Sequence, residues 1–292
     1  MHSTRVVKII YDWIPFKQQF FTCIKFFWRP PLSIYMHLHF KGIFTTTIEG
    51  RKLKLQHYGY HIENSVFWEG LVDGREKFSM QLWIKLCKRS TVIVDVGANT
   101  GIFSLVAKTM QPTAAVFAFE PFHNAYEKLK ANHQLNNFKT VCIESALSDY
   151  DGKAVIYAPS LDNVLSVAVN KNLTEPGTKV YEMEIQTMQL ATFIERYQIT
   201  SIDLMKIDVE THEAEVLTGM GKYLEIYKPA MLIEILSDEV GQKVEELVAG
   251  KGYLYFNIDE DKGVRRVEHI LKSDYYNYLL CNAETAVYLG LK

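Results

Sequence analysis

The sequence lacks paired cysteines. Its four cysteines lie far apart and form no CxxC pair: Cys23, Cys87, Cys142 and Cys281. Zinc sites and disulfide frameworks need closely spaced or regularly patterned thiols, so the spacing argues against both kinds of site. It is typical of a protein of the reducing cytoplasm. We therefore expect a cytoplasmic protein in which all four cysteines are small core residues.

The sequence also lacks an excess of charge of one sign. The formal net charge is -2 over 292 residues, and the basic side chains are scattered along the chain. Binding to a nucleic acid usually depends on a basic patch or stripe. The charge pattern therefore predicts no nucleic-acid partner.

Long uninterrupted apolar runs are missing as well. The most apolar N-terminal stretch, residues 6–28, is broken by Lys8, Asp12, Pro15, Lys17 and Lys25. A membrane-spanning helix needs ~20 mostly apolar residues, and a signal peptide needs an unbroken apolar run with a small-residue cleavage site. Neither pattern is met, so we expect no integral membrane segment.

The same stretch nevertheless predicts an amphipathic helix. Apolar side chains recur at helical spacing at Phe16, Phe20, Ile24 and Phe27, whereas Gln18 and Lys25 fall on the other side. The favoured interpretation is that the stripe packs against the catalytic domain of its own chain or against a second subunit, as in a homodimer formed through this segment. The alternative is a helix that lies on a surface.

Residues 1–90 contain many aromatic side chains and no glycine-rich nucleotide loop. Alternating patterns at 44–50 and 53–58 predict a short hairpin that covers part of the main sheet, and 78–88 has the periodicity of a helix. We therefore divide the chain into an N-terminal extension, residues 1–90, that packs on the core, and a catalytic domain, residues 91–292.

From residue 91 onward, apolar strands alternate with helical segments. Strands are expected at 91–96, 114–119, 140–145, 202–209, 230–236, 253–258 and 275–281, with helices at 101–109, 123–135, 190–197, 213–219 and 240–249. A polar stretch at 161–176 is predicted to be an active-site loop. The alternation predicts an α/β fold with a doubly wound, mostly parallel seven-stranded sheet of Rossmann-like type.

One motif joins a buried strand to a helix through a turn with two glycines. Residues 92–101 read VIVDVGANTG, with Asp95 two positions before Gly97 and with Gly101 four positions after it. Glycine lets the backbone approach a ligand closely, and free amides at a helix start attract a carboxylate or a phosphate. The glycine spacing differs from the GxGxxG of dinucleotide-binding proteins. It therefore argues against an NAD-dependent oxidoreductase.

Glu120 follows the next predicted strand. A carboxylate at the tip of this strand can accept hydrogen bonds from both hydroxyls of a ribose. The alternative is an acid that only complements the dipole of the following helix. Because Glu120 lies in step with Asp95 one βα unit earlier, we favour the ribose role and a nucleoside cofactor.

Four motifs in this order resemble those of the FkbM family of methyltransferases: DVGANTG at 95–101, AFEP at 118–121, ALSD at 146–149 and KIDVE at 206–210. The resemblance spans residues 68–234. It implies a class I methyltransferase fold and S-adenosylmethionine as methyl donor. It also implies O-methylation of a hydroxyl on a sugar, a glycan or a small natural product.

The resemblance also implies which residues bind the cofactor. Gly97, Asn99 and Gly101 would surround its methionine part, within a loop that also contains Asp95, Ala98 and Thr100. Glu120 would hold the ribose. The adenosine would lie against four further residues: Pro121, Phe122, Ser145 and Ala146. Asp208 would lie near the transferred methyl group, together with Glu210.

One position departs from the family pattern DxEGxE. This chain has Thr211 and then His212 where the family has glycine and its next residue. Glycine there would allow substrate or backbone to approach closely, so the two residues are expected to reshape the acceptor pocket.

Methyl transfer to a hydroxyl needs a base or a metal that helps to remove the proton. The candidates at the carboxyl edge of the sheet are Asp208, Glu210, His212, Glu213 and Glu234. We favour His212 or Asp208 as the base and assign no residue as a metal ligand. In the alternative, the carboxylates hold a magnesium ion that binds the acceptor oxygen.

Several of these residues also have purely structural interpretations. Glu210 and Glu213 suit the first turn of a helix, His212 suits an exposed helix start, and Lys206 is expected to pair with one of the acids. A cofactor-binding scaffold of a glycan-synthesis system, without catalysis, therefore stays open beside the enzyme.

Overall fold

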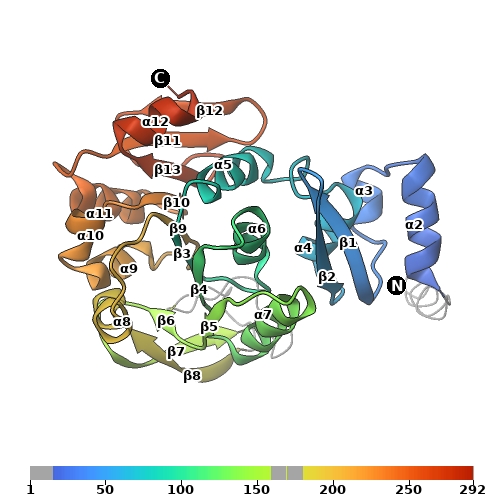
Figure 1. Ribbon diagram of the computed structural model, residues 1–292, viewed down its shortest axis with the longest axis horizontal. Helices are drawn as coiled ribbons and strands as arrows, with labels where there is room; N and C mark the ends of the chain where they lie inside the picture. Colours follow the sequence, from blue (N-terminus) through green and yellow to red (C-terminus); the bar gives the residue numbers. More distant parts are fainter. Residues whose placement is uncertain (1–15, 159–168, 170–179, 292) are drawn as a thin grey trace.

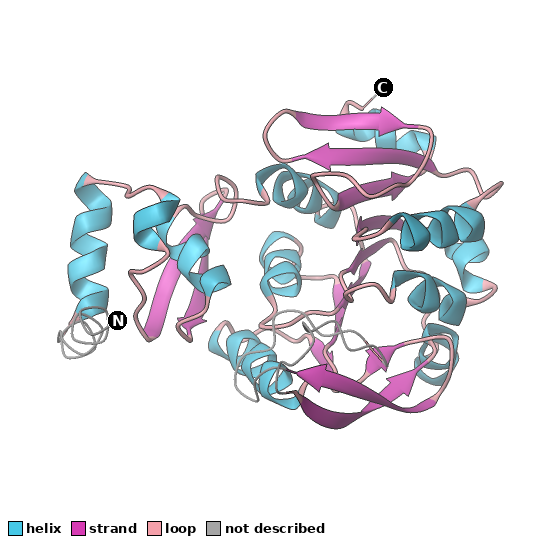
Figure 2. Ribbon diagram, turned by 180° about the vertical axis from the view of Figure 1, so that it is seen from behind, coloured by secondary structure: helices cyan, strands magenta, loops and turns pink. Residues whose placement is uncertain are grey.

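The computed structural model describes residues 16–158, 169 and 180–291. The predicted active-site loop at 161–176 lies outside the described residues except for Val169. The described part of the chain is built of helices and strands throughout (Figures 1 and 2). The elements are α2 Lys17–Phe27, α3 Leu32–Tyr35, β1 Gly42–Ile48, β2 Arg51–His57, α4 His61–Trp68, α5 Lys77–Cys87, β3 Val92–Val96, α6 Ile102–Met110, β4 Ala115–Phe119, α7 His123–Leu135, β5 Val141–Ile143, β6 Ala146–Leu147, β7 Gly152–Ala158, β8 Tyr181–Met188, α8 Leu190–Tyr197, β9 Leu204–Ile207, α9 Glu213–Met220, α10 Tyr223–Tyr227, β10 Ala230–Glu234, α11 Asp238–Val248, β11 Leu254–Asp259, β12 Gly263–Val267, β13 Asn277–Cys281 and α12 Ala283–Leu289.

The main sheet has eight strands in the order β12-β11-β13-β10-β9-β3-β4-β5. The five strands from β10 to β5 are parallel to one another, and the three at the other end are antiparallel. The predicted mostly parallel α/β sheet is confirmed, with one strand more than the seven expected. The additional strand, β12, is a partly exposed edge strand with two arginines, so it lacks the apolar run that marks a buried strand.

Strand β3 is apolar at every position except Asp95, because helices cover both faces of the sheet. Ile93 packs into the core under α5 and α6, whereas Val94 and Val96 pack into the core under α8, α9 and α11. Successive side chains of a strand point to opposite faces, so a strand covered on both faces is apolar throughout. The two helical layers therefore explain the sequence of β3.

The strand order reverses beside β3. The chain proceeds from β3 to β4 and β5 on one side, and it later continues from β9 to β10 on the other. In open α/β sheets the ligand binds at this reversal, outside the carboxyl ends of the strands. The topology therefore places the ends of β3, β4, β9 and β10 around one crevice.

The predicted hairpin exists as β1 and β2, but its expected location is wrong. It does not cover the main sheet, because β2 packs on α6 and α7. Arg51 donates to the carbonyls of Thr109 and Met110 at the end of α6, and the Gln56 amide donates to Asn132 of α7. The hairpin thus forms a further layer outside these helices.

The predicted N-terminal helix exists as α2, but most of its apolar stripe does not pack on the chain. Phe16, Phe20 and Phe27 are exposed, and Phe21 is the buried residue of the helix. Of the stripe, only Ile24 packs against the core, so packing of the whole stripe against its own domain is wrong. Packing against a second subunit stays a prediction. None of the helices within residues 16–158 and 180–291 is long and apolar enough to cross a membrane.

A second sheet, with the order β6-β8-β7, was not predicted. It begins directly after β5, and Ala146, Ala154 and Ile156 pack there with Phe122. The sheet therefore adds an apolar wall beside the carboxyl end of β4. Its strands carry alternating charged residues because one of their faces is exposed.

Candidate active site

The turn after β3 is held against the neighbouring strands by its backbone. The amides of Gly97 and Ala98 both donate to the carbonyl of Phe119 at the end of β4. Gly97 has a φ of 76°, and a Cβ atom at this position would lie 1.9 Å from the carbonyl oxygen of Asp208. Glycine is required there because no side chain fits between the ends of β3 and β9.

Asp95 stabilises the start of the helix that follows this turn. Its Oδ2 accepts a hydrogen bond of 2.8 Å from the amide of Ser104 in the first turn of α6. Burial raises the pKa of Asp95 to about 6. One carboxylate oxygen is thus used to position the helix, while the residue still lines the cavity described below.

Glu120 is fixed at the tip of β4 by two backbone amides. Its Oε2 accepts from Asn99 at 2.8 Å and its Oε1 from Phe122 at 2.9 Å. Burial raises the pKa of Glu120 to about 7, against these two hydrogen bonds, which lower it. A carboxylate has about four acceptor sites, so two stay available for hydroxyl groups of a ligand.

A cavity of about 460 Å³ opens at these strand ends. This volume lies within the ~300–1,000 Å³ that small-molecule sites usually have. Its wall contains all but one of the residues predicted to bind the cofactor: Asp95, Gly97, Ala98, Asn99, Thr100, Glu120, Pro121, Phe122, Ser145, Ala146 and Asp208. The exception is Gly101, whose Cβ would lie 2.6 Å from Leu129 and whose φ is 95°. Gly101 therefore shapes the turn and does not line the cavity.

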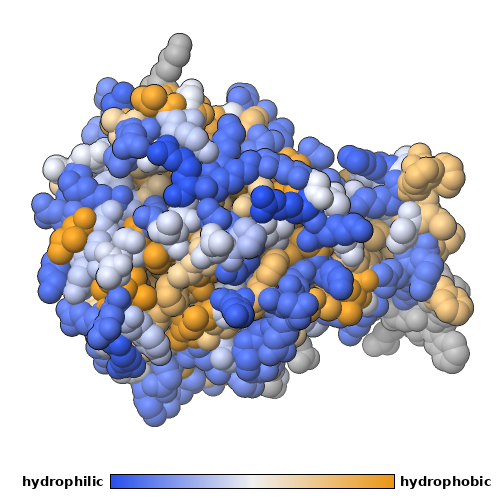
Figure 3. Space-filling model, in the orientation of Figure 1, coloured by the Kyte–Doolittle hydropathy of each residue, from blue (hydrophilic) through white to orange (hydrophobic). Residues whose placement is uncertain are grey.

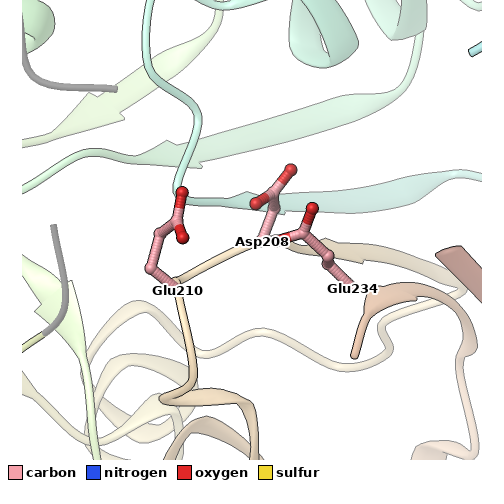
Figure 4. Close-up of side chains that lie close together, drawn as sticks. All are labelled: Asp208, Glu210 and Glu234. Carbon is pink, nitrogen blue, oxygen red and sulfur yellow. The ribbon is translucent and has the colours of Figure 1, made fainter. Parts of the chain in front are cut away.

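Three carboxylates meet at one side of this cavity (Figure 4). Oxygen atoms of Asp208, Glu210 and Glu234 all lie within 4.8 Å of one another. Lys206, which is almost fully buried, forms an ion pair of 2.9 Å with Asp208. Burial opposes the charged form of Lys206, but the surrounding carboxylates outweigh it and raise its pKa above the ordinary value. The ammonium group therefore neutralises part of the cluster.

Glu234 has a strongly raised pKa. Burial, followed by the negative charge of Asp208, raises the pKa of Glu234 to about 9. At neutral pH its carboxyl group is therefore protonated and can donate a hydrogen bond, whereas Asp208 is paired with Lys206. Environment separates the two acids into a donor and an acceptor.

His212 and Glu213 lie outside the cavity wall. The Nε2 atom of His212 lies 3.0 Å from the hydroxyl of Ser148, next to the second sheet. Glu213 is buried and accepts hydrogen bonds of 3.3 Å from the amides of Val209 and Thr211. The structure thus brings Asp208, Glu210 and Glu234 together without His212, and we leave His212 out of the mechanism proposed below.

The departure from the family pattern at position 211 has a conformational consequence, because the backbone conformation there favours glycine. Thr211 has a φ of 76° and Glu210 a φ of 54°, both in the left-handed region. A β-branched residue is strained in this region, whereas glycine is not. Neither Thr211 nor His212 lines a cavity at the strand ends, so the structure does not support the expectation that they reshape the acceptor pocket.

Two cavity residues lie in a loop that no sequence motif marks. Arg75 and Glu76, between α4 and α5, line the cavity, and Glu76 lies near Lys206 and Asp208. Glu76 accepts a hydrogen bond of 3.2 Å from Asn277, and burial raises its pKa. Only the tertiary structure brings this loop to the strand ends, so sequence reasoning missed both residues.

A second cavity, of about 600 Å³, adjoins the first. The two share walls at Ile62, Arg75, Glu76, Ile102 and Glu234. Its remaining wall includes aromatic and polar side chains, among them Tyr275, Tyr276 and Asn277. The carboxyl group of Glu234 therefore lies where the two cavities meet.

The strand order and the crevice at its reversal define an α/β protein of the Rossmann-like class. Comparison with known proteins identifies the family. Residues 95–260, more than half of the chain, match the family model described as the methyltransferase FkbM domain. The chain belongs to this methyltransferase family, which confirms the resemblance seen in its motifs.

Individual relatives are similar over part of the chain. Methyltransferase sdnD of Sordaria araneosa is 27% identical over 197 residues, which are 58% of this chain and 75% of that protein. Hexuronic acid methyltransferase AglP of Haloferax volcanii is 27% identical over 150 residues, 51% of this chain and 58% of that protein. The match thus spans less than two thirds of AglP.

Among solved structures, methyltransferase FkbM from Methylobacillus flagellatus KT is similar with a TM-score of 0.43 and 14% identity. The similarity covers 65% of this chain and 43% of that one. It is too distant to carry an argument, so the description of the fold depends on the strand order alone.

Proposed function

We propose that the protein transfers a methyl group from S-adenosylmethionine to a hydroxyl group of a sugar, a glycan or a natural product. One observation carries the proposal. A single cavity joins the glycine turn and Glu120 to the carboxylates at the ends of β9 and β10. A cofactor bound at the glycine turn and at Glu120 would direct its reacting group toward these carboxylates.

The residues present fit this cofactor. The two acceptor sites left on Glu120 match the two hydroxyls of a ribose. Phe122 and Ala146 supply apolar surface for an adenine ring. The second oxygen of Asp95 and the buried hydroxyl of Thr100, which has no hydrogen-bond partner among the described residues, suit a polar amino-acid end.

When bound, S-adenosylmethionine supplies an electrophilic methyl group on a positively charged sulfur. Asp208 accepts the proton of the acceptor hydroxyl, and Lys206 holds its carboxylate in place at 2.9 Å. Glu234, protonated at neutral pH, donates a hydrogen bond that orients the acceptor oxygen. The new O–C bond forms as the S–C bond breaks, and the proton remains on Asp208.

Magnesium is the alternative to this arrangement. The three carboxylates offer the oxygen ligands that the ion prefers. Lys206 already places a positive charge at Asp208, however. We therefore propose proton removal without a metal. Activity that is lost with EDTA and recovered with Mg²⁺ would replace this proposal by the metal-assisted one.

The second cavity suits the acceptor. Aromatic side chains beside carboxylates and amides are a suitable lining for a sugar ring, and Tyr275, Tyr276 and Asn277 provide both. Arg75 at the shared wall can pair with an acidic group. Together with the hexuronic acid methyltransferase among the relatives, this makes a sugar acid the first acceptor to test.

Calorimetric titration tests the cofactor. We expect saturable binding of S-adenosylmethionine and S-adenosylhomocysteine, no binding of NAD, and at least tenfold weaker binding to Glu120→Ala. Because the ribose hydroxyls need an ionised Glu120 and its pKa is about 7, binding should be weaker at pH 6 than at pH 8. A folded protein that binds neither sulfur compound contradicts the proposal.

Turnover tests the reaction. Formation of S-adenosylhomocysteine is measured with methyl glucuronide, methyl glucoside and phenolic acceptors in parallel. Methylation of a hydroxyl in any of them supports an enzyme. Cofactor binding without turnover of any acceptor would favour the non-catalytic scaffold.

A further inference from the structure

Two polar side chains of helix α2 reach the protein beside the apolar Phe21 and Ile24, whereas Gln19 and Thr22 are exposed. Lys25 donates a hydrogen bond to the carbonyl of Phe67, and Gln18 donates one to the carbonyl of Ile43. Phe21 is the buried residue of the helix and packs against Phe40 and Trp68. Both polar contacts end on backbone carbonyls of the chain, so this orientation of the helix is specified by the fold.

The opposite side of α2 carries large aromatic residues that are open to solvent. Their exposed fractions are 76% for Phe16, 58% for Phe20, 83% for Phe26, 84% for Phe27 and 50% for Trp28. We call these five residues the aromatic face. A helix of 3.6 residues per turn places positions 20 and 27 within about 20° of each other. Phe16, Phe20 and Phe27 therefore share one side of the helix, whereas position 26 lies about 120° from position 20 and Trp28 follows the helix in an extended conformation.

The apolar surface continues beyond the helix. Leu32 and Ile34 of the neighbouring α3 are exposed as well. Figure 3, in the orientation of Figure 1, shows apolar atoms gathered over α2 at the right edge of the molecule. Monomeric soluble proteins rarely expose contiguous apolar patches of this kind unless they bind something.

The surrounding segment is basic. Residues 16–48 contain Lys17, Lys25, Arg29 and Lys41 and no aspartate or glutamate, which gives this segment a net charge of +4. The whole chain, with 32 basic and 34 acidic residues, has a net charge of -2. The remaining residues, with 28 basic and 34 acidic side chains, have a net charge of -6, so positive charge is concentrated in the segment that contains the aromatic face.

From these observations we infer that the aromatic face docks on the surface of an anionic lipid bilayer. Aromatic side chains on one side of a short helix, with basic residues beside them, are the features of a helix that lies in the membrane interface. The 11 residues of α2 correspond to about 16 Å, roughly half of the ~30 Å hydrocarbon core. The helix therefore lies on the membrane and does not span it.

Charge also distinguishes this partner from a second copy of the chain. A symmetric dimer through the aromatic face would bring together two segments of charge +4, which repel each other. An anionic bilayer instead offers opposite charge and an apolar layer for the rings. A single weak anchor binds membranes reversibly, and apolar and basic contributions together strengthen it.

Cosedimentation with vesicles tests the inference, independently of the methyl-transfer proposal. The full-length protein is mixed with vesicles of phosphatidylcholine alone or of phosphatidylcholine and phosphatidylglycerol in equal parts. We expect at least tenfold more bound protein on the anionic vesicles, and release at high salt. A Phe20→Gln/Phe27→Gln variant should bind at least tenfold more weakly, because glutamine keeps the helix and removes the rings.

The matched control changes two exposed apolar residues elsewhere, Ile226→Gln/Val287→Gln, and should bind like the unchanged protein. All variants are compared by circular dichroism and cofactor titration, so a misfolded variant is recognised. Equal binding by the aromatic-face variant, or none by the unchanged protein, overturns the inference. Light scattering that shows a dimer abolished by Phe20→Gln/Phe27→Gln, with no vesicle binding, assigns the face to self-association instead.

Discussion

At the scale of single residues, the site contains two neighbouring acids in different surroundings. Asp208 is partly exposed and paired with Lys206, whereas burial and Asp208 raise the pKa of Glu234 to about 9. The same side-chain chemistry therefore provides a proton acceptor and a hydrogen-bond donor within one cluster, as the proposed transfer requires.

Amide substitutions separate these two roles. Glu234→Gln keeps a neutral donor, so kcat at pH 7 should change by less than about threefold, whereas Asp208→Asn should lower kcat by ~10²–10⁴-fold. The activity of the unchanged protein should fall above about pH 9 as Glu234 ionises. That decline should be absent in Glu234→Gln. Steady-state rates of S-adenosylhomocysteine formation between pH 6 and 10 measure both effects. Equal losses in the two variants would contradict the assignment.

At the scale of elements, the connection from β9 to α9 combines strain with capping. Glu210 and Thr211 are both left-handed, and the buried carboxylate of Glu213 accepts hydrogen bonds from the amides of Val209 and Thr211. Such strain is retained where the surrounding structure determines the backbone. Here it positions Asp208 and Glu210 at the cavity.

Replacing the strained residue tests this account. Thr211→Gly should stabilise the protein by ~1 kcal/mol, because the strain removed exceeds the entropy cost of glycine. For a chain of this size this gain corresponds to a rise in Tm of ~2–4 °C. Differential scanning calorimetry measures the change, and Thr211→Ala serves as control because alanine also disfavours a φ of 76°. A lower Tm for the glycine variant would show that position 211 is not strained.

At the scale of the whole molecule, several buried acids are held near the cavity or beside it. Burial raises the pKa of Asp95 to about 6 and the pKa values of Glu63, Glu120 and Glu213 to about 7. Each of these groups ionises near its ordinary pKa in the unfolded chain. Above that pH the unfolded state releases protons that the folded state retains, so folding becomes less favourable.

Stability should therefore fall as the pH rises from about 4.5 to about 7, and Glu234, whose pKa is raised to about 9, should extend the fall to about pH 9. Glu63 is fully buried, and neither of its carboxylate oxygens has a hydrogen-bond partner among the described residues. A 2.5-unit shift corresponds to up to about 3 kcal/mol for this group. Glu63→Gln, which stays neutral, should flatten the dependence of the unfolding free energy on pH, as measured with urea at pH 5 and pH 7.5. An unchanged slope in the variant would exclude Glu63 as a source of the effect.

Much of the fold could be predicted because local patterns report it. Strands buried on both faces appear as short apolar runs, and helices begin where those runs end. The positions of β3, β4, β9 and β10 along the chain could therefore be predicted. The edge strand β12 and the exposed face of the second sheet carry polar residues, so their patterns resembled loops. The apolar pattern of a strand depends on its burial, and edge strands are the least buried.

The sequence by itself determined the α/β class, the family and the residues of the cofactor turn, because a strand, a glycine turn and a helix are adjacent in the chain. Only the tertiary structure decided which side of α2 faces the protein. A helical stripe shows that one face is apolar, but not what covers it. Tertiary structure likewise brought Arg75 and Glu76 to the cavity and left His212 beside Ser148. These placements depend on contacts between segments far apart in the chain, which no local pattern encodes.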